Sequence, residues 1–412
     1  MARPLQNQPL NPKRVFYVAG PGDSVGAHKA WKAGLHDPTE VSITFSSQIE
    51  QYAKDVGAAL YIVCYHHEKT YFEDGDVTIE HLPKPSPGAS GLAYHLRELA
   101  YGLKLLRRAI RFKADVAILD SGCTHYFWQS LFAAAGIKVV PVLHNSLWPN
   151  GFRPSGAAVR LIEMLDRPFW RRVPLASLCV SPVCSRQVEE LAGPDCRPLL
   201  QIRAQFQKDF FDRIPPAPPH DRRPFQIMFI GRVTEGKGVL DIVEMARQVE
   251  TRAPGRVRWV VCGTGAELEE MKQRISALGL DQAVEAKGWT SLDDLVEVYA
   301  QSHCSIVPTR STFVEGLAMT AAEAALAGRP LISNPVVPAL ELLRSAAVAG
   351  RTNDPDSYVE EILKLIDDPD WYAAMVAACP EASAPFLDRR YGLTHILKVV
   401  LNGEPDAQIE QS

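Results

Sequence analysis

A polar loop between an apolar run and a helix carries residue types that bind an anion. The segment reads PTRSTFVEGLAMTAAEAALAGRP over Pro308–Pro330, and the apolar run before it ends at Val307. Gly316 lets the backbone approach a ligand closely, and the N–H groups of Leu317–Met319 are unpaired donors at the positive end of the following helix. This segment therefore predicts a site suited to a diphosphate.

Two glutamates flank the predicted anion site. Glu323 lies roughly 8 Å along the helix, at about 1.5 Å per residue, which is about the distance from a β-phosphate to a ribose. Its carboxylate can accept hydrogen bonds from both ribose hydroxyls. Glu315, at the tip of the loop, is expected to face a sugar on the other side of the phosphates. The alternative for each is a solvated glutamate, which the helix dipole favours near a helix start.

A second glycine-rich loop supplies two cations. It reads GRVTEGKG over Gly231–Gly238, directly before a predicted helix, and contains Arg232 and Lys237. When a sugar leaves a nucleotide diphosphate, either a metal or fixed cations must stabilise the negative charge that develops. Because no Asp-x-Asp-like cluster stands at a predicted strand end, we expect fixed cations and no metal. The alternative is a solvated turn.

Two further segments follow predicted strands of the same half. Gly265, in the turn GTGAEL, again joins a strand to a helix. Trp289, in KGW, either flanks a nucleobase or packs on the core, and core packing is the favoured interpretation.

Short apolar runs alternate with amphipathic segments along the chain, which predicts an α/β fold with parallel sheets. In the first half we expect a helix over Gly91–Phe112, whose leucines and Ile110 fall on one face, and a loop over Tyr71–Ser90. The predicted buried strands of this half are Val15–Ala19, Ala59–Cys64, Val116–Leu119, Lys138–Leu143 and Leu178–Val180.

A change of composition at Ile214–Pro224 suggests where one domain ends. Its five prolines in eleven residues predict a stiff connector without regular structure. The alternation then restarts, with strands expected at Phe225–Ile230, Val257–Cys262, Val284–Gly288, Ser305–Val307 and Pro330–Ser333. We predict two doubly wound, Rossmann-like domains, 1–213 and 225–380, that face each other across a central cleft. Residues 381–412 are expected to return to the first domain.

Bulk composition narrows the class of protein. The 412 residues carry a formal net charge of -4, which argues against a nucleic-acid partner. The eight cysteines form no CxxC pair, so we expect reduced thiols and no zinc site. The N-terminus lacks the apolar core of a signal peptide, and no apolar stretch is long enough to span a membrane. These features predict a cytoplasmic protein.

Read in order, four segments resemble the donor domain of family 4 retaining glycosyltransferases of the GT-B fold. They are GRVTEGKG, VVCGTGAELEEMK, EAKGW and PTRSTFVEGLAMTAAEAALAGRPLIS, spread over roughly Phe225–Ser333. The resemblance implies a metal-independent enzyme that binds a nucleotide-diphosphate sugar in its C-terminal domain and needs no cofactor. It implies that Arg232 and Lys237 hold the diphosphate, that Glu315 contacts the donor sugar and that Glu323 takes the ribose.

The same resemblance assigns the remaining donor-binding residues. Gly231 and Gly265 belong to the donor loops, and the backbone amides of Gly316, Leu317 and Ala318 hold phosphate. Many members of the family have Phe-Gly where this chain has Leu317-Ala318. That change keeps the amides but puts the shape of the loop in question.

The N-terminal half resembles the family less closely. Gly22 and Asp23 follow the first strand, like the family's glycine-rich loop that faces the cleft, although Asp23 could equally cap the next helix. His144 ends the strand Lys138–Leu143, where the family has a cleft-facing histidine, and it is preferred over the competing His125. The expected acceptor is a glycan or a lipid-linked hydroxyl, as in polysaccharide or glycoconjugate biosynthesis.

The predicted reaction is a front-face substitution by a hexosyltransferase that retains the anomeric configuration. The donor phosphate helps to deprotonate the acceptor, and Arg232 and Lys237 stabilise the phosphate that departs. A covalent role for Glu315 stays open. The alternatives are a GT-B nucleotide-sugar epimerase, which needs acid and base groups at C2, and a non-catalytic scaffold that binds nucleotide-sugars.

Two basic segments of the first half permit a membrane interpretation. One lies between Lys104 and Lys113 and the other between Arg167 and Arg172. We interpret these charges as a solvated face, with peripheral contact at the inner membrane face as the alternative.

Overall fold

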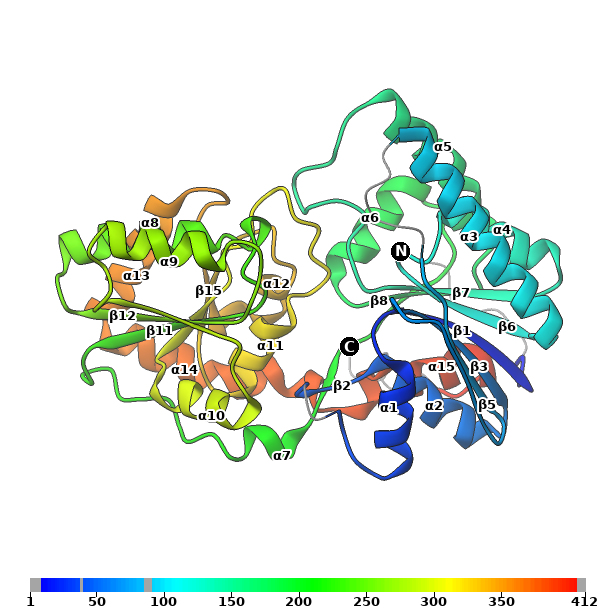
Figure 1. Cartoon of the computed structure of the whole chain (residues 1–412), viewed down its shortest axis with the longest axis horizontal. Helices are drawn as coiled ribbons and strands as arrows, with labels where there is room; N and C mark the ends of the chain where they lie inside the picture. The colour runs from blue at the N-terminus through cyan, green and yellow to red at the C-terminus, as the bar shows by residue number, and fades with distance from the viewer. Residues whose placement is uncertain (1–8, 38–39, 85–90, 406–412) are drawn as a thin grey trace. The chain divides into compact units, whose positions relative to one another are not determined.

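The computed structural model describes residues 9–37, 40–84 and 91–405, and it divides into two compact units (Figure 1). The first unit holds the described residues up to Leu147, then Pro154–Gln205, and the chain from Asp388 onward. The second unit holds Trp148–Arg153 and Phe206–Leu387. Each unit is built on one sheet with helices packed against it, as the alternation of elements predicts.

The first unit contains an eight-stranded sheet in the order β4-β5-β3-β1-β6-β7-β8-β9. All neighbouring strands are parallel except β4 and β5, which are antiparallel. The strands are β1 (Arg14–Pro21), β3 (Ala59–Tyr65), β4 (Thr70–Asp74), β5 (Val77–His81), β6 (Val116–Asp120), β7 (Lys138–Leu143), β8 (Ser177–Cys179) and β9 (Leu199–Gln201). The helices are α1 (Ser24–Lys32), α2 (Phe45–Val56), α3 (Gly91–Phe112), α4 (Tyr126–Ala134), α5 (Ala157–Arg172), α6 (Pro182–Ala192) and α15 (Leu393–Asn402).

The hairpin β4–β5 corrects the loop predicted over Tyr71–Ser90. Strand β5 adds to the sheet beside β3, with Leu60 opposite Val77, and Ile79 is fully buried. In β5, apolar residues alternate with polar ones, which is the pattern of a half-buried strand. Because this strand is short and lies in a polar segment, the pattern is easily missed in the sequence. Residues 85–90 of the predicted loop lie outside the described part of the chain.

Helix α3 has the predicted limits, but the face that it buries is not the leucine face. Its buried residues are Glu98, Tyr101, Gly102, Leu105 and Ala109. A side chain at Gly102 would clash with the Trp128 indole of α4, since an added Cβ would lie 2.4 Å from it. Much of the leucine face is exposed, by 74% at Leu92, 56% at Leu96 and 50% at Ile110, while Leu99 and Leu106 are half-buried.

The second unit contains a six-stranded parallel sheet in the order β13-β12-β11-β14-β15-β16. Its strands are β11 (Phe225–Ile230), β12 (Val257–Cys262), β13 (Val284–Gly288), β14 (Cys304–Ile306), β15 (Leu331–Ser333) and β16 (Ala347–Ala349). Its main helices are α8 (Val239–Arg252), α9 (Leu268–Ala277), α10 (Leu292–Gln301), α11 (Met319–Leu326), α13 (Pro355–Asp367) and α14 (Pro369–Ser383). The first five strands follow the predicted ranges closely. Strands β11, β12, β14 and β15 are apolar runs buried along most of their length, whereas the edge strand β13 is buried only at its two ends.

The proline-rich stretch 214–224 is part of the second unit and is not a free connector. The Tyr372 hydroxyl donates to the Pro218 carbonyl at 2.9 Å, and the buried Arg329 guanidinium donates to the Pro215 carbonyl at 2.8 Å. The boundary between the units accordingly lies at Gln205, earlier than the predicted 213. The chain re-enters the first unit at Asp388, where α15 packs on α2.

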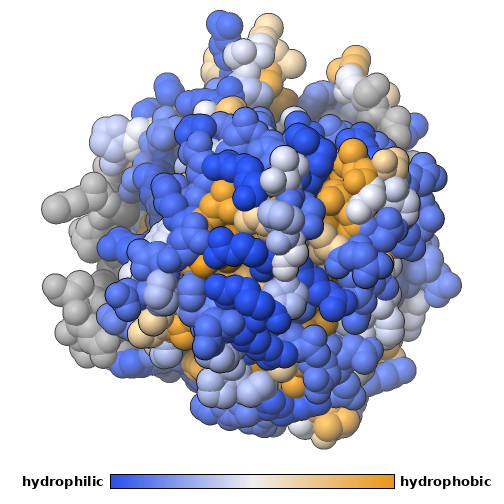
Figure 2. All heavy atoms as spheres, turned by 90° about the vertical axis from the view of Figure 1, so that its left-hand side faces the viewer, coloured by the Kyte–Doolittle hydropathy of each residue, from blue (hydrophilic) through white to orange (hydrophobic). Residues whose placement is uncertain are grey.

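The side of the molecule where α8, α9 and α13 lie is mostly hydrophilic (Figure 2). Among the described residues, none of the helices combines the length and the apolar content needed to cross a bilayer.

Candidate functional site

The two glycine-rich turns of the second unit pack against each other at the carboxyl ends of β11 and β12. The Val233 N–H donates to the Thr264 carbonyl at 2.9 Å, and the Glu267 N–H donates to the Val233 carbonyl. A Cβ on Gly265 would lie 2.0 Å from that Val233 carbonyl oxygen. This close approach alone requires a glycine at 265, and it fixes the loop that carries the predicted cations.

Lys237 and Glu315, predicted from separate segments, are in direct contact. The Lys237 Nζ lies 2.5 Å from Oε2 of Glu315, and the Thr309 hydroxyl donates to the same oxygen at 3.3 Å. Both side chains of the pair are largely buried, with 15% and 9% exposure. A buried, charge-assisted contact of this kind holds both groups in a defined geometry.

Both predicted cations also lie against one aromatic ring. Lys237 Nζ is 4.5 Å from the centroid of Phe313, and the Arg232 guanidinium carbon is 5.5 Å from it. Arg232 is exposed and forms no ion pair with any residue in the described part of the chain. Phe313 therefore gathers two positive charges, one neutralised by Glu315 and the other open to an anion.

The backbone before α11 presents the predicted phosphate-binding amides. Within the described residues, the N–H groups of Gly316, Leu317 and Ala318 donate to no backbone or side-chain acceptor. The helix begins at Met319, with Ala318 as its N-cap in the left-handed region at φ 69°. The left-handed conformation thus falls at the alanine and not at Gly316. Free amides at a helix start form an anion site.

A buried asparagine holds the loop that carries Thr309. The Asn334 amide donates to the Thr309 carbonyl at 2.8 Å and to the Tyr358 hydroxyl at 2.7 Å, and its oxygen accepts from Val336 N–H at 2.8 Å. Asn334 follows β15 directly. Sequence reasoning missed it, and the polar residue after a buried strand is the signal that could have found it.

Glu323 and Trp289 occupy different environments. The Tyr299 hydroxyl donates to Glu323 Oε2 at 3.4 Å, and burial followed by the Glu323 charge raises the pKa of Tyr299 well above its usual value. Trp289 is 75% exposed, so the predicted core packing is wrong. Trp289 follows the edge strand β13 directly.

In the first unit, Asp23 caps α1. Its Oδ1 accepts from the Gly26 N–H at 2.9 Å and lies 3.5 Å from Nε2 of His81. The capping role that the sequence left open is therefore present, while the carboxylate stays 62% exposed. Gly22 is held beside it, since its carbonyl accepts from the Cys64 thiol at 2.9 Å.

His144 lies beside a buried carboxylate that sequence reasoning missed. Its Nε2 is 2.9 Å from Oδ1 of Asp120, which ends β6. The other carboxylate oxygen accepts from the Tyr17 hydroxyl at 2.7 Å and from the Gly20 N–H at 3.2 Å. Asp120 thereby connects the ends of β1, β6 and β7, and a buried carboxylate orients the neighbouring imidazole.

The competing histidine forms no ion pair with a carboxylate of the described residues. His125 precedes α4, and its Nε2 is 3.0 Å from Nδ1 of His95. Burial, and then the His95 charge, lower the pKa of His125. The two candidate histidines are thus in different surroundings, and His144 is the one in contact with Asp120.

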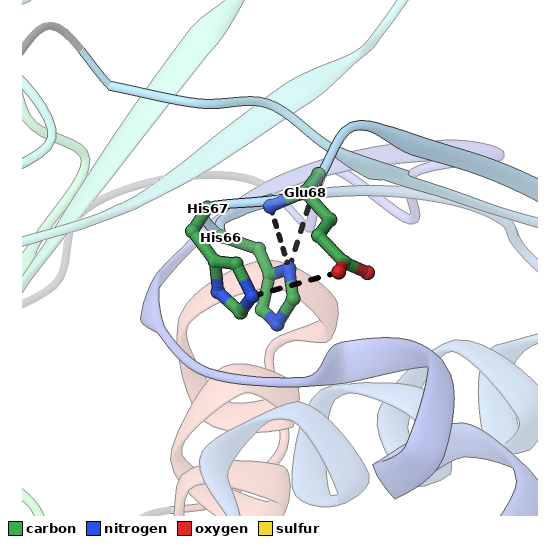
Figure 3. A group of neighbouring side chains, drawn as sticks. All are labelled: His66, His67 and Glu68. Carbon is green, nitrogen blue, oxygen red and sulfur yellow. Dashed lines mark hydrogen bonds and ion pairs between the residues drawn. The ribbon is translucent and has the colours of Figure 1, made fainter.

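One loop contains side chains that could hold a metal ion. His66, His67 and Glu68 follow β3, and their ligand atoms lie within 4.8 Å of one another (Figure 3). The His66 Nδ1 accepts from the Glu68 N–H at 3.1 Å, and the His67 Nε2 lies 3.8 Å from Oε1 of Glu68. This group contains none of the residues predicted to bind the donor.

The match to a known family falls within the second unit. Residues 210–381 match the family model described as "Glycosyl transferases group 1". The chain is 26% identical over 179 residues to an alpha-D-kanosaminyltransferase of Streptomyces kanamyceticus. That match covers 42% of this chain and 43% of the relative, so it spans less than half of either protein.

Solved structures resemble the whole chain. HepE of Anabaena, in complex with UDP, is 14% identical with a TM-score of 0.63, and the match covers 97% of this chain and 98% of that one. Sucrose-phosphate synthase of Thermosynechococcus elongatus is 12% identical with a TM-score of 0.69, covering 97% and 100%. The chain therefore has the GT-B fold of two Rossmann-like domains, as its sequence predicts.

Proposed function

We propose that this protein is a glycosyltransferase that moves a sugar from a nucleotide-diphosphate donor to an acceptor hydroxyl. The observation that carries the proposal is the arrangement in the second unit. There Lys237, Arg232 and the free amides of Gly316–Ala318 surround the buried Glu315 with donors for an anion. The match of residues 210–381 to group 1 glycosyl transferases supports it.

The reaction follows from the charges available. The bond between the anomeric carbon and the leaving phosphate oxygen breaks, and the acceptor oxygen bonds to that carbon on the same face. The acceptor proton passes to the departing phosphate, whose charge Lys237 and Arg232 stabilise. The products are a retained glycoside and a nucleoside diphosphate. This chemistry uses fixed cations and backbone amides and does not require a metal.

The first unit supplies groups suited to an acceptor. The exposed carboxylate of Asp23 and the imidazole of His144 can bind sugar hydroxyls, and Asp120 positions His144. The proposed acceptor is a glycan or a lipid-linked hydroxyl on the cytoplasmic side of a membrane, in polysaccharide or glycoconjugate synthesis.

A thermal-shift panel of nucleoside diphosphates and their sugars, with and without EDTA, tests the donor site. UDP comes first, because the Anabaena structure holds it. We expect one nucleotide to raise the melting temperature, with no effect of EDTA. In the variant Lys237→Ala, turnover should fall because about 2–4 kcal/mol of transition-state stabilisation is lost. Turnover near wild type with an unchanged donor KM would falsify the assignment, and stabilisation that EDTA abolishes would refute metal independence.

We also propose that the protein contacts an anionic membrane surface through helix α3. The positions Leu92, Leu96, Leu99, Leu103, Leu106 and Ile110 follow the three- and four-residue spacing of one helix face. Beside this face stand Arg97, Lys104, Arg107 and Arg111, which are exposed and form no ion pair with a described residue. The helix's one carboxylate, Glu98, is buried against Lys84. An apolar stripe beside a basic band fits anionic lipid better than a second copy of the same basic helix.

Flotation with vesicles tests this surface. We expect the protein to float with phosphatidylglycerol-containing vesicles at low salt and to stay in solution with pure phosphatidylcholine vesicles. Leu96→Glu combined with Leu103→Glu should abolish flotation, whereas a control substitution at the exposed Leu278 of the second unit should not. Absence of flotation by the wild-type protein at low salt would remove the membrane from the proposal.

A further inference from the structure

The first unit contains a second concave site, formed by the C-terminal end of α1, by α2 and by the start of α15. This cavity has a volume of about 910 Å³. None of Gly22, Asp23 or His144 is among its lining residues. It is therefore separate from the groups assigned above to the acceptor, and its inference does not rest on the proposed glycosyl transfer.

The lining of this cavity is strongly cationic. Its lining includes four basic side chains and one carboxylate, that of Asp74. The basic residues are Lys32, Lys54, Arg389 and Lys398. Three histidines, His28, His36 and His395, also line it. Such an excess of positive charge in a concave site raises the local concentration of anions.

Two of these cations are not neutralised by the protein. Lys32 pairs with Asp74, and Lys398 lies 2.7 Å from Asp55, outside the lining. Lys54 and Arg389, by contrast, form no ion pair with a residue of the described chain. Lys54 instead lies 5.5 Å from the ring centroid of Trp31, which leaves its charge available.

Helix α15 adds donors at the same place. Its N-cap, Gly392, and its residues Thr394 and His395 line the cavity. The Leu393 N–H is taken by Gln48, but the N–H groups of Thr394 and His395 have no acceptor among the described residues. The His395 Nε2 is buried and has no hydrogen-bond partner. The other ring nitrogen of His395, Nδ1, lies 3.9 Å from Oε2 of Glu404. A helix start, the unpartnered Nε2 of His395 and two free cations thus converge on one cavity.

We propose that this cavity binds the phosphoryl group of a small phosphorylated ligand. A phosphoryl group carries up to two negative charges and three acceptor oxygens, which suits two free cations and several unpaired N–H donors better than a single carboxylate does. Inorganic phosphate and a phosphorylated metabolite share this chemistry. The volume of about 910 Å³ exceeds what phosphate fills, so the ligand carries an organic part as well.

Isothermal titration calorimetry with inorganic phosphate and with glucose 6-phosphate, in a phosphate-free buffer, tests the site. We expect saturable binding of one equivalent, tighter for the sugar phosphate, and unchanged in Lys237→Ala, which silences the donor site. Arg389→Ala and Lys54→Gln should each weaken binding at least tenfold. Arg390→Ala is the matched control, because the neighbouring Arg390 pairs with Asp388 and does not line the cavity. Melting temperatures of all variants check that they fold.

Each other outcome has a defined meaning. Equal affinity for the two probes would contradict the organic part of the proposed ligand and would leave only the binding of a phosphoryl group. No saturable heat with either probe would overturn the proposal. Full affinity in a folded Arg389→Ala variant would also overturn the proposal. Loss of binding in Lys237→Ala alone would overturn it too, because the anion would then bind at the donor site, and the proposed glycosyl transfer would stay intact.

Discussion

Lys237 and Glu315 are 78 positions apart in the sequence and meet at 2.5 Å in the second unit. The cation predicted to hold a diphosphate is thus neutralised by the carboxylate predicted to contact the donor sugar. Under the proposed function, an incoming diphosphate competes with Glu315 for Lys237, while the Thr309 hydroxyl donates to the carboxylate. The pair would then link donor binding to the position of Glu315.

Glu315→Gln therefore separates binding from turnover. Removing the carboxylate frees Lys237, and we expect nucleoside diphosphate affinity to rise about tenfold, the value of roughly one charged hydrogen bond. Turnover should fall, because the donor sugar loses its charged partner. Calorimetry and initial rates measure the two effects. Glu361→Gln, which breaks the exposed pair with Lys364, is the control and should change neither. Weaker nucleotide binding in Glu315→Gln would contradict this account.

Asp120→Asn tests the buried carboxylate beside His144. The amide keeps the size of the side chain but loses the charge that positions the imidazole, so we expect kcat to fall by about ten- to a hundredfold. The donor KM should stay unchanged while the acceptor KM rises, a split that a loss of folding cannot produce. Asp115→Asn is the control, because Asp115 precedes the same strand and its carboxylate accepts hydrogen bonds from the N–H groups of Lys13 and Arg14. Equal losses in both variants would refute a specific role for Asp120.

The features predicted correctly from sequence are local in the chain. The strand, loop and helix around Gly231–Gly238 and Pro308–Pro330 are each set by neighbouring residues, so apolar runs and glycines locate them. The missed residues act over long separations. Asp120 contacts Tyr17 across 103 positions, and Asn334 is identified only when β15 and the Thr309 loop are brought together.

Helix α3 shows a second limit of sequence reasoning. Its periodicity locates the helix correctly, but a leucine face does not say what covers it. The buried side of the helix contains Gly102, whose lack of a side chain admits Trp128 of α4, whereas much of the leucine face is exposed. A large exposed apolar face often marks an interaction surface. The helical period shows that apolar residues share one face, but it does not show whether that face is buried in the core or exposed.

Ala318→Gly tests the strained start of α11. An alanine at φ 69° costs about 1–2 kcal/mol, whereas glycine adopts this conformation freely but loses more entropy on folding. We expect unfolding free energy to stay level or to rise by up to about 1 kcal/mol. Ala322→Gly, in the buried middle of the same helix, should lose about 1–2 kcal/mol from helix propensity and the buried methyl. Urea denaturation compares them, and a larger loss at 318 than at 322 would rule out strain at Ala318.

Asp166 gives the first unit a pH-dependent stability. It is buried in α5, where its carboxylate accepts from the Phe127 N–H at 2.8 Å. Burial raises the pKa of Asp166 from 3.8 to about 7, against the lowering effect of that hydrogen bond. The folded state therefore holds a proton that the unfolded state releases, and stability should fall as pH rises from about 4 to about 7.

Asp166→Asn removes this dependence, because the amide oxygen can still accept from Phe127 N–H without carrying charge. Near pH 4 the variant and the wild type should unfold at similar urea concentrations, since the Asp166 carboxyl group is protonated in the folded protein and largely protonated in the unfolded chain. At pH 8 the variant should be the more stable by about 3–4 kcal/mol, the value of a shift of roughly three pKa units. A variant that is equally destabilised at both pH values would show that Asp166 is ionised in the fold and contributes through its charge.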